Sequence, residues 1–172
     1  GGGEGNVARA GDGVIAGGYH NTLDGLYNVL GGGYGNHESG LYAVTAGGIF
    51  HTNSGFHAVI GSGPQPPLSN AASAVIAGGA FNRVLHVGSI SYGDGNYSVI
   101  GGGSNNWANQ DYCVVGGGSG NQAGGDEYLS FGYDTVAGGQ KNTATGDYGA
   151  VGGGYWNQAT GYASTVVGGN IN

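Results

Sequence analysis

The chain has 172 residues, of which 44 are glycine and only 8% are charged. This composition excludes an ordinary helical enzyme domain, because glycine is entropically costly inside helices and strands, and it excludes collagen, which needs glycine at every third position and much proline. The formal net charge of −7, with only three Lys and Arg residues, makes DNA, RNA and anionic membrane surfaces poor partners.

A fifteen-residue repeat that begins with asparagine runs along the chain. Its consensus is N-x-A-x-G-x-Y-x-V-V-G-G-G-x-x, and the clearest copies in chain order are residues 21–35, 36–50, 106–120, 142–156 and 157–171. Repetition at a fixed period is the signature of a solenoid, in which each repeat contacts only its neighbours. We therefore treat residues 1–172 as one repeat domain.

Each repeat is too short for a helix with its connections, and its residues favour strand. Tyr27 to Leu30 is rich in β-branched and aromatic residues and predicts a short strand, which Gly31 to Gly33 ends in a turn. Coils of this kind stack about 4.8 Å apart, so that each strand pairs with the coils above and below. The sequence thus predicts an all-β parallel β-solenoid.

Three columns of the repeat have predicted structural roles. The asparagine in the first position is expected to form a ladder between coils or to cap a turn, with a ligand role as the alternative. Alanine in the third position indicates an interior with room only for a methyl group. The turn glycines expected from the pattern are Gly17, Gly32, Gly47, Gly102, Gly117, Gly138, Gly153 and Gly168.

The repeat loses its phase near residues 64–74, 86–98 and 126–136. The first segment contains three prolines and one extra residue, and because proline cannot donate to a strand ladder we expect residues 64–67 to bulge from the stack. The other two segments read as short coils that begin at Ile90 and Leu129. At these places the solenoid is expected to change shape.

The ninth and tenth positions are both apolar in most repeats. Neighbouring residues of a strand point to opposite faces, so one of each pair fills the interior and the other faces outward in a continuous apolar stripe. The valines of this stripe, or of the core, are Val14, Val29, Val44, Val59, Val75, Val99 and Val114. The pattern predicts self-association along the rod, and a three-fold axis is the simplest closed arrangement of parallel fibres.

A tyrosine column in the seventh position is the best candidate for ligand binding. It contains Tyr27, Tyr42, Tyr112 and Tyr148, with His57 in place of tyrosine once. Aromatic stacking between coils is one interpretation. The other is an exposed ladder that docks a protein or a glycan with rigid, amphipathic rings.

No catalytic or metal-binding constellation is visible in the sequence. The five histidines fall in different columns, and Cys113 lies in a valine-rich run without a nearby base. The isolated Gly11-Asp12-Gly13 and Gly93-Asp94-Gly95 lack the tandem nine-residue repeats of calcium-binding β-rolls. We therefore expect no enzymatic activity, no metal and no cofactor.

The repeat resembles the YadA-like heads of trimeric autotransporter adhesins, whose pattern is A-x-A-x-G-x-x-S-V-A-I-G. Residues 142–153 (NTATGDYGAVGG) and 157–169 (NQATGYASTVVGG) carry the likeness, with asparagine in place of the first alanine and a richer glycine run. The resemblance implies a left-handed β-roll in a side-by-side homotrimer. It also implies an outer-membrane virulence fibre at the bacterial cell surface, which binds host matrix or other cells.

These expectations define a non-enzymatic adhesin head, with itself and a host matrix protein or a cell-surface glycan or protein as partners, and without direct membrane contact from this segment. A phage tail-fibre shaft on the virion, or a structural spacer, is the alternative. An ice-binding solenoid is a third reading, which requires a threonine column. The threonines are scattered instead: Thr22, Thr45, Thr135, Thr143 and Thr165.

Overall fold

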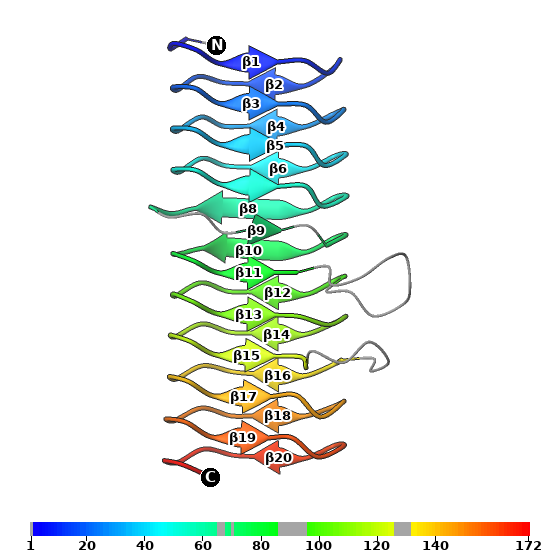
Figure 1. Cartoon of the computed structure of the whole chain (residues 1–172), viewed down its shortest axis with the longest axis vertical. Coiled ribbons are helices and arrows are strands. Elements are labelled where there is room, and N and C mark those ends of the chain that lie inside the picture. The colour runs from blue at the N-terminus through cyan, green and yellow to red at the C-terminus, as the bar shows by residue number, and fades with distance from the viewer. Residues whose placement is uncertain (1, 65–67, 70, 86–95, 126–131) are drawn as a thin grey trace.

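The chain forms a straight stack of short parallel strands (Figure 1). The computed structural model describes residues 2–64, 68–69, 71–85, 96–125 and 132–172, and these contain twenty strands and no helix. Odd-numbered strands make one ten-stranded sheet and even-numbered strands make the other, so the chain crosses from sheet to sheet at every turn. The predicted parallel β-solenoid with coils of about fifteen residues is confirmed.

Most strands are only two residues long, because glycine and asparagine interrupt the extended backbone on both sides. The odd-numbered sheet contains β1 (Val7–Ala8), β3 (Thr22–Leu23), β5 (His37–Glu38), β7 (Thr52–Asn53), β9 (Leu68–Ser69), β11 (Arg83–Val84), β13 (Trp107–Ala108), β15 (Gln122–Ala123), β17 (Thr143–Ala144) and β19 (Gln158–Ala159). The even-numbered sheet contains β2 (Val14–Ile15), β4 (Val29–Leu30), β6 (Val44–Thr45), β8 (Val59–Ser62), β10 (Val75–Gly78), β12 (Val99–Ile100), β14 (Val114–Val115), β16 (Thr135–Val136), β18 (Ala150–Val151) and β20 (Thr165–Val166).

The coil at the proline segment keeps its place in the stack. Val59 of β8 pairs with Val75 of β10, which confirms the single extra residue. Pro64 lies in a bend, and residues 65–67 of the predicted bulge lie outside the described residues. Strand β9 pairs with β7 on one side and with β11 on the other, so both sheets continue past this segment.

Two coils are longer than the rest. The backbone nitrogen of Asn106 bonds to the side chain of Asn82 across 24 residues, and that of Asn142 bonds to Asn121 across 21. The prediction of separate short coils is therefore wrong, because β11 pairs directly with β13 and β15 with β17. The extra residues fall between β11 and β12 and between β15 and β16 in the chain; Ile90 and Leu129 themselves lie outside the described residues.

The interior is a thin apolar column. Its largest apolar members come from the third and tenth positions of the coils and are fully buried or nearly so: Leu23, Leu30, Ile60, Ile76, Val84, Ile100, Val115, Val136 and Val151. Alanines of the third position such as Ala108 are also buried, but Leu23 shows that the expected limit to a methyl group is wrong. Gly13 makes the room, because a Cβ there would lie 2.5 Å from Leu23 Cδ2.

The asparagine column forms the predicted ladder. Asn121 is representative: its Oδ1 accepts the backbone N–H of Asn142 at 2.9 Å, and its Nδ2 donates to the carbonyl oxygens of Gly117 and Gly139 at 2.8 and 2.9 Å. The same side chain thus caps a turn of its own chain segment and ties two coils together. The other members of the ladder are Asn6, Asn21, Asn36, Asn82, Asn106, Asn142, Asn157 and Asn172, and His51 takes the place of asparagine once.

The glycine pairs beside this ladder turn the chain, although the second member of each pair carries the stricter requirement. Of the eight predicted turn glycines, Gly17 and Gly138 do not have a positive φ, and the others have φ between 137° and 158°. Their successors lie deeper in the left-handed region, as in Gly118 with φ 89°. A Cβ on Gly118 would lie 2.0 Å from the carbonyl oxygen of Gly139, so only glycine fits.

Candidate functional site

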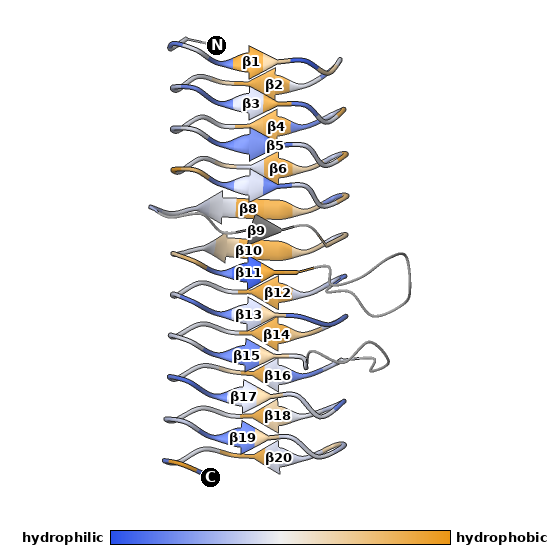
Figure 2. Cartoon of the chain, viewed as in Figure 1, coloured by the Kyte–Doolittle hydropathy of each residue, from blue (hydrophilic) through white to orange (hydrophobic). Residues whose placement is uncertain are grey.

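The outer face of the even-numbered sheet is an uncharged apolar strip. Its ninth-position valines point away from the core: Val14, Val29, Val59 and Val114 are exposed and Val44, Val75 and Val99 are half-buried. The hydrophobic colour in Figure 2 is strong on even-numbered strands such as β2, β12 and β14 and paler on β16 and β20. In the last three coils the ninth position holds Thr135, Ala150 and Thr165. Residues in the ninth to thirteenth positions include no Asp, Glu, Lys or Arg in any coil. We call this surface the valine face.

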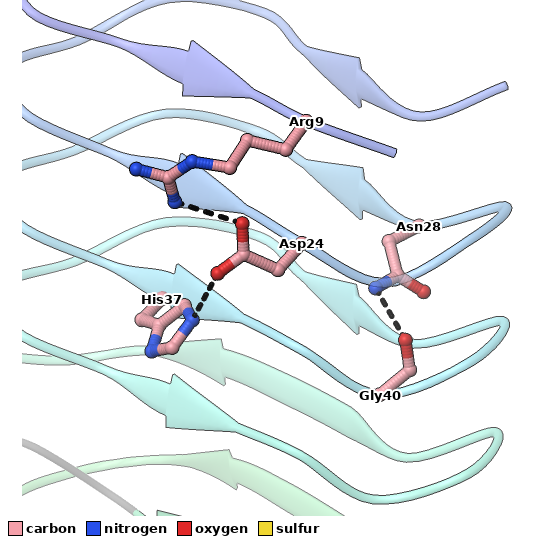
Figure 3. A network of polar contacts seen from close by, with 5 residues as sticks. All are labelled: Arg9, Asp24, Asn28, His37 and Gly40. Carbon is pink, nitrogen blue, oxygen red and sulfur yellow. Dashed lines mark hydrogen bonds and ion pairs between the residues drawn. The ribbon is translucent and has the colours of Figure 1, made fainter. Parts of the chain in front are cut away.

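The odd-numbered sheet presents a polar outer face. Near the N-terminus, Asp24 Oδ1 accepts from Arg9 Nη1 at 2.9 Å, while Asp24 Oδ2 lies 3.0 Å from His37 Nε2 (Figure 3). The hydrogen bond from Arg9, and then that from His37, lowers the pKa of the Asp24 carboxyl below its ordinary value. The other outward residues of this sheet are mostly polar, with Val7 and Trp107 as exposed apolar exceptions.

The seventh-position tyrosines lie at the turns that lead from the odd-numbered to the even-numbered sheet. Tyr97, Tyr112, Tyr133 and Tyr148 occupy four successive coils, with ring centroids 5.1, 4.7 and 5.1 Å apart and interplanar angles of 9°, 6° and 6°. All four side chains are exposed, between 43% and 56%. We call this set the tyrosine ladder; both predicted features, stacking and exposure, occur together in it.

A shorter stack occupies the same column nearer the N-terminus. Tyr27 and Tyr42 have ring centroids 4.9 Å apart and an interplanar angle of 8°. His57 follows them at 5.2 Å from Tyr42, and Phe56 closes the stack edge-on. The four tyrosines named from the sequence thus belong to two separate stacks. The fifteen-residue count did not place Tyr97 and Tyr133 in the column, because the extra residues of the two long coils shift them from the seventh position.

Every residue of this column has a left-handed backbone conformation. The φ angles of the six stacked tyrosines lie between 57° and 65°, which is uncommon for bulky residues. The predicted strand from Tyr27 to Leu30 is therefore wrong at its start: Tyr27 lies in the turn, and the strand contains only Val29 and Leu30. The turn itself does not need a ring, because Asp12, Ser73 and Ala163 adopt the same conformation in other coils.

The opposite edge of the solenoid carries a second set of aromatic residues. Tyr19 and Tyr34 stack with centroids 6.2 Å apart, and Phe50 meets Tyr34 edge-on at 5.2 Å. At the other end of the rod, Lys141 Nζ lies 5.3 Å from the ring centre of Trp156. These contacts are less regular than the tyrosine ladder, because the fourteenth and fifteenth positions vary more between coils.

Two buried carboxyls interrupt the apolar interior. Burial raises the pKa of Glu38 to about 7, opposed by the nearby Thr45 and Asn53, and neither Glu38 carboxyl oxygen has a hydrogen-bond partner among the described residues. Burial also raises the pKa of Asp134 to about 6, while a hydrogen bond from the backbone N–H of Gly149, 2.6 Å from Asp134 Oδ1, opposes the shift. Asp134 Oδ2 has no partner in the described structure.

The remaining residues considered from the sequence do not form a reactive centre. Cys113 is fully buried, and burial raises the pKa of its thiol to about 12, which disfavours the reactive thiolate. Across residues 2–64, 68–69, 71–85, 96–125 and 132–172 there is no group of three or more His, Cys, Asp or Glu side chains that would hold a metal ion. The described part of the chain also lacks any helix long and apolar enough to cross a membrane.

The chain was compared with protein-family models and with curated proteins. No protein-family model matches the chain, and a search of curated proteins gives no match.

Proposed function

We propose that the chain is a non-enzymatic fibre module that assembles side by side with copies of itself and attaches one surface to another. The observation that carries the proposal is the valine face, which extends along the whole rod without a charged residue. Strands that are apolar on both faces are normally buried on both faces. We therefore expect the valine face to be buried against another molecule.

A second copy of the chain is the partner that best fits the valine face. Ten strands about 4.8 Å apart and about four consecutive residues across give a surface of roughly 600 Å², approaching the 800 Å² that each partner buries in a standard interface. A copy has the same spacing between rungs, and the glycine and alanine residues beside the valines allow close approach. The arrangement proposed is a homotrimer of left-handed coils, as in the YadA-like heads that the repeat resembles.

In this assembly the tyrosine ladder of Tyr97, Tyr112, Tyr133 and Tyr148 faces outward and serves attachment. Repetition along a rod multiplies weak contacts, so that modest individual sites give firm overall binding. The proposed location is the bacterial cell surface, with a host matrix protein or a cell-surface glycan or protein as the target. A fibre shaft or spacer is the second candidate, favoured by the asparagine ladder, which links Asn6 to His51 and Asn82 to Asn172. A spacer would assemble but would not bind cells.

Charges placed on the valine face test the assembly. The double variant Val99→Lys and Val114→Lys puts two ammonium groups on the proposed interface, where their desolvation is costly. Sedimentation equilibrium is expected to show trimers for the natural chain and monomers for the variant, with the β-sheet circular dichroism of both unchanged.

The matched control places the same charges on the polar face, in Thr143→Lys and Gln158→Lys. This variant is expected to remain trimeric. A natural chain that sediments as a stable, folded monomer would overturn the proposed assembly. Loss of trimers in both double variants would also count against it, because the effect would then be unrelated to the valine face.

A further inference from the structure

We propose that the tyrosine ladder binds a neutral, extended β-linked polysaccharide that lies along the solenoid axis and is recognised through the row of phenol hydroxyls. This inference rests on the proposed attachment function and names the class of its target. Its basis is the combination of strained backbone, ring stacking and local charge around Tyr97, Tyr112, Tyr133 and Tyr148.

The backbone points to a role for the rings beyond forming the turn. Left-handed conformations favour Gly, Asn and Asp, and Asp12 occupies this column in the first coil. The chain nevertheless places tyrosine there in four successive coils. Strained residues of this kind concentrate at sites that contact ligands, where the surrounding structure holds them in place.

The stacking decides which part of each tyrosine is available. Within the ladder the ring planes are nearly parallel and about 5 Å apart, so neighbouring rings cover one another's faces. The outer edges and hydroxyl groups remain exposed, and those hydroxyls have no hydrogen-bond partner within the described structure. A ligand lying along the ladder therefore meets a row of hydrogen-bonding groups and not a set of open ring faces.

The spacing of this row selects the type of polymer. An extended peptide along the axis repeats on one face about every 6.6 Å, which does not match rings 4.7 to 5.1 Å apart. Nucleic acid is disfavoured by the net charge of −7. In an extended β-linked polysaccharide alternate pyranose rings are flipped, but each ring carries hydroxyl groups on both of its edges. Hydroxyl groups therefore recur along one edge of the polymer at every ring, at a spacing close to that of the ladder.

The charges beside the ladder favour a neutral sugar. Asp111 and Asp147 directly precede Tyr112 and Tyr148 in the chain and place negative charge beside the ladder. Asp111 Oδ1 accepts the backbone N–H of Asn96 at 2.7 Å, which holds that carboxylate at this edge. No cation balances them at this edge, because Arg9 pairs with Asp24 on the polar face and the other two lie over tryptophan rings, Arg83 over Trp107 and Lys141 over Trp156. An anionic glycan would be repelled.

The test removes hydroxyls and keeps the rings. Trimeric natural chain is mixed with microcrystalline cellulose and, separately, with chitin, and the bound fraction is measured after sedimentation of the polymer. Binding to at least one polymer is expected. The variant Tyr112→Phe with Tyr133→Phe is expected to bind roughly tenfold to a hundredfold more weakly, as the loss of two hydrogen bonds implies, with the same melting temperature.

The control variant carries the same changes in the two-ring stack, Tyr27→Phe with Tyr42→Phe, and is expected to keep its polymer binding. The inference is overturned if the natural chain binds neither polymer, or if the ladder variant binds as well as the natural chain. It is also overturned if the ladder variant loses its trimers, since the ladder would then be a contact between copies.

The failure of this inference can be told apart from the failure of the proposed function. A chain that binds neither polymer but still attaches to cells as a trimer disproves the polysaccharide and leaves the attachment function in place. A folded monomer that attaches to no cell surface disproves the attachment function itself.

Discussion

Asp134 occupies the same position in its coil as Asn28, and the comparison shows what the carboxyl lacks. Asn28 Oδ1 accepts the backbone N–H of Ala43 at 2.7 Å, and its Nδ2 donates to the carbonyl oxygen of Gly40 at 2.7 Å (Figure 3). Asp134 repeats the first bond with Gly149. In place of the amide donor it has Oδ2, which donates only when the carboxyl is protonated.

The variant Asp134→Asn is expected to stabilise the protein at neutral and alkaline pH. The raised pKa of Asp134 means that its contribution to stability is complete below the ordinary aspartate pKa and is lost as pH rises through about 6. The amide removes that loss, so we expect a gain of up to about 3 kcal/mol at about pH 8 and little change at about pH 4. Thermal unfolding followed by circular dichroism at both pH values measures it.

The reverse change supplies the control. Asn28→Asp places a carboxyl in an equivalent buried position, and it is expected to destabilise the protein more at about pH 8 than at about pH 4. Equal effects of Asp134→Asn at the two pH values would show that the Asp134 carboxyl does not titrate within this range. Glu38, with its pKa raised to about 7, adds to the same loss of stability toward alkaline pH in the natural chain.

At the scale of the element, the turn is set by glycines that look alike in the sequence and differ in the structure. Gly118 has φ 89° and no room for a Cβ, whereas Gly138 lacks a positive φ and has nothing within 4 Å of a built Cβ. Gly118 is the second member of its Gly-Gly pair, and Gly138 is the first member of another pair. Their difference arises from the neighbouring coil, since the carbonyl of Gly139 and the amide of Asn121 press against Gly118.

Alanine substitution separates these two glycines. Gly118→Ala is expected to cost at least about 2 kcal/mol, because it combines backbone strain with a clash against backbone atoms. Gly138→Ala is expected to be neutral or to stabilise by up to about 1 kcal/mol through the unfolded chain. Urea unfolding of the two variants provides the comparison, and a larger loss for Gly138→Ala than for Gly118→Ala would contradict the turn geometry.

The period of the sequence predicts strands, sheets and the asparagine ladder because each depends on residues one repeat apart. The period does not predict the left-handed backbone of the seventh-position tyrosines. Aromatic and β-branched residues favour strand in isolation, and the left-handed turn is imposed by the stacking of coils. Tyr97 and Tyr133 were recoverable, because each stands two residues before an apolar pair or its Thr-Val equivalent, as Tyr112 does. The burial of Glu38 was recoverable too, because it stands in the third position of its repeat, where Leu23 and Ala108 are interior; its chemical type alone argues for solvent exposure.

At the scale of the whole molecule, the uncharged valine face implies an assembly held by the hydrophobic effect. Salt screens interactions between charges but does not weaken apolar burial, and screening reduces the repulsion between copies that each carry a formal charge of −7. We expect the trimer to persist or to strengthen when NaCl is raised from about 0.01 M to about 1 M. Sedimentation velocity at both concentrations checks this, and dissociation at high salt would indicate an interface built on ion pairs.

The two long coils show that the stack of strands accepts added sequence between β11 and β12 and between β15 and β16. The coils of 24 and 21 residues keep their ladder bonds to the coil that follows, as Asn82 does with Asn106 and Asn121 with Asn142. Lengthening a loop costs little closure entropy, about 0.6 kcal/mol for each doubling. The solenoid is therefore suited to peptide display: foreign segments grafted between β15 and β16, and repeated in other coils, would stand in a row whose spacing is a multiple of one rung.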